Sequence, residues 1–191
     1  QAYQGLSGFT NTPTSITAAK NGGYLAGGYV ADIPFGNLSF YESGLVIKIA
    51  EGGCAEWSKT LRNQFYTKVE KILALKDGGF LITGLTDNKL FLLNLSSTGD
   101  VRWSRTLNVD GEQMTLTSLL ETDDGHFVIG GQVWNKGVAI LKSDPAGNVQ
   151  WSRFFTRPGG SLTGYVATRL LQKNNDVYLF CDVALFQPGP V

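Results

Sequence analysis

The side chains that could perform chemistry in this sequence are few and scattered. His126 is the only histidine among 191 residues, so a Ser–His–Asp triad or a histidine-based metal site would have to use it. It occupies a turn position that Gly23 and Gly79 hold in related segments, which indicates a simple turn substitution. The chain has no HExxH, GxxxxGK[ST] or GxGxxG motif. We therefore predict no catalytic residue, no metal and no cofactor.

Two pairs of carboxylates lie in segments that we expect to be loops. Asp110 and Glu112 belong to NVDGEQ, and Asp32 and Glu42 belong to VADIPFGNLSFYESG. Two carboxylates about 5–10 Å apart could hydrolyse a glycosidic bond. Sequence spacing does not set that distance, and loop carboxylates are usually solvated, so hydrolysis is an alternative and not the leading interpretation.

Composition and charge exclude several classes of function. Lys+Arg and Asp+Glu number 16 each, so the chain has no net charge to attract nucleic acid or an anionic membrane. No apolar run of about 18 residues predicts a membrane span, and no leader pattern opens the chain. Cys54 and Cys181 have no metal-ligand spacing; we expect Cys181 to pack as a small apolar side chain, and a disulfide between the two stays open.

The elements that must position any site come from an internal repeat, which is the strongest signal. Four segments, KNGGYLAGG, KDGGFLITG, TDDGHFVIGG and KNNDVYLFCD, align on an aromatic residue at Tyr24, Phe80, Phe127 and Tyr178. Three others, EGGCAEW, STGDVRW and PAGNVQW, align on a glycine followed four residues later by Trp57, Trp103 and Trp151. These tryptophans are 46 and 48 residues apart.

Each repeat predicts four short antiparallel strands joined by glycine turns. We therefore expect an all-β chain, a β-propeller or propeller segment, forming a single domain or part of one over 1–191. Its units span roughly 15–61, 67–107, 115–156 and 166–191, and the last is incomplete because it lacks a third strand and the tryptophan. Residues 1–9, with Tyr3 at the tryptophan position, align with an outer strand that would complete a terminal blade. Trp57, Trp103 and Trp151 are expected to be structural, packing between blades.

The segment DDGHFVIGGQVWNKGVAILKSDPAGNVQWSRFF resembles the repeats of secreted and surface-attached bacterial β-propellers. The similarity covers about three units. It implies propeller blades and an extracellular or cell-surface location, but it says little about activity.

A second resemblance is to propellers of the pyrroloquinoline-quinone type, whose eleven-residue docking motif has glycine at its seventh place and tryptophan at its eleventh. The glycine–tryptophan pairs Gly53/Trp57, Gly99/Trp103 and Gly147/Trp151 match these two places. The threonine expected before the glycine is present only at Thr98, and the earlier alanine and aspartate are absent. The resemblance therefore covers the tryptophan clasp and not the cofactor site.

Loops between units and loops between second and third strands should emerge on one face, because neighbouring strands alternate in direction. This face carries the insertion VADIPFGNLSFYESG and the segments RNQFYTK, NVDGEQMT and TRPGGSLTGYV. Aromatic and arginine side chains are favoured anchors in recognition. The candidate ligand-binding residues are therefore Phe35, Tyr41, Arg62, Tyr66, Asp110, Arg157 and Tyr165.

Together these patterns favour a non-catalytic binding or structural scaffold module, extracellular or at a cell surface, that presents its loop-rich face to a protein or glycan partner. The incomplete last unit also predicts further propeller blades, from another chain or a missing segment, as partners. The alternative is a propeller-class enzyme, either a polysaccharide hydrolase or lyase or a quinone-dependent dehydrogenase.

Overall fold

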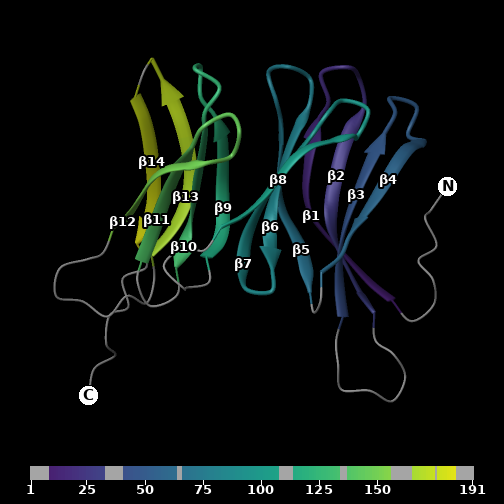
Figure 1. Ribbon diagram of the computed structural model, residues 1–191, viewed down its shortest axis with the longest axis horizontal. Coiled ribbons are helices and arrows are strands. Elements are labelled where there is room, and N and C mark those ends of the chain that lie inside the picture. The colour runs from purple at the N-terminus through teal and green to yellow at the C-terminus, as the bar shows by residue number, and fades with distance from the viewer. Residues whose placement is uncertain are drawn as a thin grey trace. The chain divides into compact units, whose positions relative to one another are not determined.

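The computed structural model describes residues 9–32, 41–63, 66–107, 114–133, 137–155, 165–174 and 176–183. In this described part of the chain, all regular elements are strands, and they form four antiparallel sheets (Figure 1). No helix long and apolar enough to cross a membrane occurs among these residues. The prediction of an all-β chain built from blade-like sheets is confirmed.

Each sheet is an up-and-down meander whose strands follow chain order. Blade 1 consists of β1 (Phe9–Ala18), β2 (Tyr24–Asp32), β3 (Tyr41–Ile49) and β4 (Ala55–Leu61). Blade 2 consists of β5 (Thr67–Ala74), β6 (Phe80–Thr86), β7 (Lys89–Leu95) and β8 (Val101–Leu107). Blade 3 consists of β9 (Met114–Glu121), β10 (Phe127–Val133), β11 (Gly137–Ser143) and β12 (Val149–Phe155). The described residues of blade 4 form β13 (Tyr165–Lys173) and β14 (Asp176–Val183).

The chain divides into two compact units, which we describe separately. Unit 1 spans Gln1–Asn108 and contains blades 1 and 2, whereas unit 2 spans Val109–Val191 and contains blades 3 and 4. Within each unit, the two blades pack face to face around an apolar core.

The first strand of every blade carries a β-bulge at the same register position. The bulged residues are Thr14, Glu70, Thr117 and Thr168. Opposite the first three bulges lie glycines, at Gly28, Gly84 and Gly131. A Cβ at these glycines would lie 2.0, 1.8 and 2.5 Å from a carbonyl oxygen of the bulged strand. The repeated glycine is therefore required by the close approach of backbone at the bulge.

The pairing of β13 with β14 in blade 4 differs from the one that the sequence alignment predicts. In blade 2, Ala74 pairs with Phe80, and in blade 4 the equivalent Gln172 pairs with Val177, not with Tyr178. The hairpin loop is one residue shorter in blade 4, and it turns through Asn174 at φ 56°. Because side chains alternate between faces, a one-residue shift sends Tyr178 to the opposite face from Phe80.

The same shift puts Cys181, and not Asp182, opposite the bulge in blade 4. The side chain of Cys181 is exposed, so the expectation that it packs as a buried apolar group is wrong. The cause is its position on β14, which is the outer strand of a two-stranded sheet in the described residues. Cys54 is also exposed, in the turn before β4.

The core of unit 1 lies between blade 1 and blade 2. Leu25 and Val46 come from blade 1 and are fully buried. They pack against buried residues of blade 2, including Phe80, Ile82 and Leu95. Their burial follows from strand alternation, since every second residue of β2 and β3 faces blade 2. The smaller core of unit 2 contains Val128, Ile140 and Leu170, with Leu120 and Leu179 packed beside them.

The three repeat tryptophans differ in their surroundings within their own units. Trp57 is partly buried against the core of unit 1, and its indole lies where a Cβ on Gly99 would come within 2.9 Å. Gly99 belongs to the β7–β8 turn of the next blade and has φ +87°. Trp151, by contrast, is 41% exposed. Trp103 is half-buried and carries the Arg105 guanidinium 5.8 Å from its ring.

Candidate binding site

Three of the four sequence-predicted binding residues that the structure describes lie at one end of unit 1. Arg62 and Tyr66 lie in the connection from β4 to β5, next to the β6–β7 turn. Tyr41 begins β3 at this end, while Tyr165 begins β13 in unit 2; only their backbone positions are described. Phe35, Asp110 and Arg157 lie outside the described residues.

Lys68 forms the centre of a charged and aromatic cluster at this end. Its Nζ lies 2.8 Å from Glu42 Oε2, 4.7 Å from the ring centroid of Tyr29 and 6.0 Å from that of Tyr66. The four residues come from β2, β3, β5 and the connection before β5, so two blades contribute. Burial alone would lower the pKa of Lys68, but the hydrogen bond and charge of Glu42 outweigh it and raise the pKa. The ammonium therefore stays charged within reach of both aromatic rings.

Tyr66 holds the β6–β7 turn in place. Asp87 and Asn88 form this turn with φ 46° and 65°, a left-handed conformation that Asn and Asp tolerate. The backbone N–H of Asn88 donates to the Tyr66 hydroxyl at 2.7 Å, and the N–H of Tyr66 donates to Asp87 Oδ1 at 3.1 Å. A parallel bridge joins Tyr66 to Glu42 of blade 1. Tyr66 therefore positions the loop end, and its hydroxyl is engaged within the protein.

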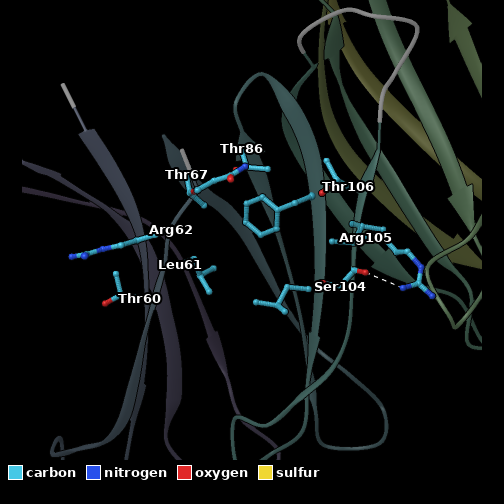
Figure 2. Close-up of a pocket in the computed structure, with 12 residues that line it drawn as sticks. Thr60, Leu61, Arg62, Thr67, Thr86, Ser104, Arg105 and Thr106 are labelled. Atoms are coloured by element: carbon cyan, nitrogen blue, oxygen red, sulfur yellow. Dashed lines mark hydrogen bonds between the residues drawn. The ribbon is translucent and has the colours of Figure 1, made fainter. Parts of the chain in front are cut away.

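A groove of about 390 Å³ runs beside this cluster, between β4 of blade 1 and the outer strands of blade 2 (Figure 2). The apolar residues in its wall are Leu61, Phe91, Leu92 and Leu93, of which the last three are largely buried. Hydroxyl, amide and guanidinium groups line the rest, at Thr60, Arg62, Asn63, Thr67, Thr86, Ser104, Arg105 and Thr106. Figure 2 shows Arg62 and Arg105 extending to opposite sides of the groove, with Leu61 between them.

The polar end of the groove is fixed by a short hydrogen-bond network. The Asn63 amide donates to Thr86 Oγ1 at 3.0 Å, and the hydroxyl oxygens of Thr67 and Thr86 are 3.1 Å apart. Thr67 and Thr86 are buried, whereas Asn63 is exposed. An apolar floor with a few fixed polar groups can hold a small neutral, polar ligand, because the polar groups set its orientation.

One expectation about the carboxylates is wrong. Asp32 and Glu42 were expected in a loop, but they lie in β2 and β3, because the strands on either side of the insertion extend further than the repeat indicates. The Glu42 carboxylate is held by Lys68, at 2.8 Å, as a structural ion pair. Among the described residues, no group of three His, Cys, Asp or Glu side chains is placed to hold a metal ion.

Sequence reasoning missed Lys68, Glu42 and Tyr29 as members of this cluster. Lys68 and Tyr29 lie within strands, and neither stands out from its neighbours in the sequence. One signal could have found the cluster. All three residues lie near strand ends on the face where the loops were expected. The opposite charges of Lys68 and Glu42 attract each other there.

Comparison with solved structures shows that the fold is that of β-propeller proteins. A protein of unknown function from Bacteroides caccae matches 86% of this chain and 51% of its own, with a TM-score of 0.56 and 14% identity. A streptogramin B lyase structure matches 90% of this chain and 52% of its own, with a TM-score of 0.53 and 15% identity. The chain therefore spans about half the length of these structures. No protein-family model and no curated protein sequence matches it.

Proposed function

We propose that the chain is a non-catalytic binding module of a secreted or cell-surface protein, and that it recognises a glycan or protein partner through the loop end of unit 1. The observation that carries the proposal is the groove of about 390 Å³ beside Arg62, with its polar end already fixed by Asn63 and Thr86. Preformed polar groups bind without a large ordering penalty, which favours recognition. The resemblance to bacterial surface propeller repeats supports the location.

The chemistry of the groove favours a glycan over a charged ligand. Threonine and serine hydroxyls and one amide line it, together with Arg62 at the rim and Arg105, which donates to the Ser104 carbonyl at 2.9 Å. The largely buried Phe91, 8% exposed, adds an aromatic group to its wall. Sugars present hydroxyl groups for hydrogen bonds and apolar ring faces for packing, so both kinds of surface are used. Arg62 is exposed at the rim, where it can reach a ligand that extends beyond the groove.

The proposal is tested by screening the purified chain on a glycan array, with a pull-down for protein partners. A glycan or protein found this way should bind at least about tenfold more weakly to the Arg62→Ala and Asn63→Ala variants, because each loses hydrogen bonds of about 1.4 kcal/mol or more. Arg153→Ala is the matched control, since Arg153 is an exposed arginine on β12 in unit 2. Equal binding by all variants would place recognition elsewhere.

The same screen separates binding from catalysis. Each bound glycan is incubated with the chain, and its products are analysed by mass spectrometry. Intact glycan supports a binding module. Cleavage that disappears in Asp110→Ala or Glu112→Ala would instead identify a polysaccharide-cleaving enzyme.

A further inference from the structure

Blades 1 and 2 pack together through a specific contact between their first strands. The backbone N–H of Ile72 on β5 donates to the Ser15 hydroxyl on β1 at 3.1 Å. The Ile72 side chain lies over Gly27, where an added Cβ would come within 2.6 Å of Ile72 Cδ1. The bulged Thr14 adds a hydrogen bond from its hydroxyl to the Val69 carbonyl at 2.6 Å. The face that carries Ser15 and Gly27 is called here the docking face, and the face that carries Ile72 the receiving face.

Blades 3 and 4 pack together through the same contact. The backbone N–H of Leu170 donates to the Ser118 hydroxyl at 2.9 Å, and Leu170 Cδ1 lies 3.4 Å from the Cβ position of Gly130. The register confirms the equivalence, since Ser15 pairs with Gly27 and Ser118 with Gly130. Two independent blade pairs therefore use a serine on the first strand and a glycine on the second.

The receiving face of blade 1 presents the same elements without a blade against them in the described structure. Ile16 pairs with Ala26 as Ile72 pairs with Ile82, yet Ile16 is 65% exposed and Ile72 only 8%. Tyr24 occupies the register position of Phe80 and is 49% exposed, whereas Phe80 is fully buried.

The turn before β4 shows the same difference. Gly53 corresponds to Gly99, and both have positive φ. At Gly99 the indole of Trp57 lies 2.9 Å from the Cβ position, while at Gly53 no atom of the described residues lies within 4 Å. Blade 1 therefore presents the complete receiving surface: an exposed isoleucine, an exposed aromatic ring and a glycine turn that leaves room for an aromatic side chain.

A second copy of this chain lacks a suitable docking face. The docking faces of blades 1 and 3 are already used by blades 2 and 4. Blade 2 has Lys71 and Thr83 at the serine and glycine positions, and blade 4 has Arg169 and Phe180. A side chain at the glycine position would occupy the space that Ile16 needs.

We infer that the receiving face of blade 1 binds a further propeller blade, supplied from outside these 191 residues, that carries serine on its first strand and glycine on its second. An aromatic side chain on the outer strand of that further blade lies over Gly53, as Trp57 lies over Gly99. The chain spans about half the length of the propeller structures that it matches, which leaves room for such a blade. The partner is thus defined by the contact already used twice in this molecule.

The inference is tested by offering the face a blade of the required chemistry. A copy of residues 9–66, which contains blade 1 and its natural connection, replaces residues 1–8 in front of Phe9. The control chain carries Ser15→Lys and Gly27→Thr in the added copy only, the pair that blade 2 has naturally. Amide hydrogen exchange at Ile16 is measured in the unextended chain and in both extended chains.

Docking should slow exchange at Ile16 at least about tenfold in the chain with the unaltered copy, because its N–H gains a hydrogen bond to the serine. The control copy should leave the rate unchanged. Equal rates in all three chains, or equal slowing by both copies, would overturn the inference. A stable dimer of the unextended chain with a protected Ile16 amide would also overturn it, since the occupant would then be a second copy.

Discussion

Gly27 and Gly130 occupy the same register position in two blades, so one substitution made at both measures how closely the blades pack. At Gly27 the Cβ of an alanine would lie 2.6 Å from Ile72 Cδ1 and 2.9 Å from Val69 Cγ1. At Gly130 the nearest atom is Leu170 Cδ1, at 3.4 Å. The first distance is a steric clash and the second is ordinary contact.

The two alanine variants should change stability in opposite directions. Overpacking at Gly27 costs about 1–3 kcal/mol, and the smaller conformational entropy of the unfolded chain returns about 0.4–1 kcal/mol. Gly27→Ala should therefore lower the free energy of unfolding of unit 1 by about 1–2 kcal/mol. Gly130→Ala meets no clash and should raise that of unit 2 by about 0.4–1 kcal/mol.

Hydrogen exchange across a urea series measures both effects, because peptides from each unit report its own unfolding. Ile72→Val removes the Cδ1 atom that the new methyl meets, so adding it to Gly27→Ala should recover part of the loss. A double-mutant cycle gives this coupling. Strict additivity of the two substitutions, or a Gly27→Ala variant as stable as the parent, would show that blades 1 and 2 are not packed this closely.

Two further outcomes follow from the structure. Trp57→Ala should destabilise unit 1 by about 2–4 kcal/mol, because the indole fills the space over Gly99. Trp151 is exposed, so Trp151→Ala should change the free energy of unfolding of unit 2 by under about 1 kcal/mol in the same urea experiment. Similar losses at both sites would contradict this. The Thr122 hydroxyl and the Lys142 ammonium lower the pKa of Asp124 from 3.8 to about 2, so this carboxylate stabilises unit 2 above pH 3.8, and the stabilisation is lost as the pH falls toward 2. Thermal unfolding followed by circular dichroism should thus show a shallower acid dependence for Asp124→Asn than for the parent; identical pH profiles would contradict this.

The repeat made most of the fold predictable. Glycine turns and alternating apolar residues marked the strands, since backbone geometry restricts which residues fit a tight hairpin. The register of blade 4 was not predictable, because Tyr178 imitates the aromatic residue of the other repeats and the shortened loop leaves no mark in composition. Lys48 shows a similar limit. It interrupts the apolar run LVIKI but is fully buried. Its ammonium donates to the Gly22 carbonyl at 2.8 Å and lies 3.2 Å from Glu56 Oε2.

The candidate site was predicted only in outline. The loop-rich end and Arg62 followed from strand direction, whereas the ion pair of Lys68 with Glu42 depends on how two blades approach each other. The contact of Ser15 with Ile72 was equally hidden, since serine on a strand is common and only the partner blade gives it a role. Such contacts between repeats cannot be read from one repeat alone.

Serine and glycine occupy the docking positions of blades 1 and 3, whereas blade 2 carries Lys71 and Thr83 there and blade 4 carries Arg169 and Phe180. A gene duplication that copied blade 2 or blade 4 would therefore place a lysine or an arginine where this contact uses a hydroxyl. A duplication of blade 1 or blade 3 would keep the hydroxyl. The two kinds of blade are therefore not interchangeable along the chain.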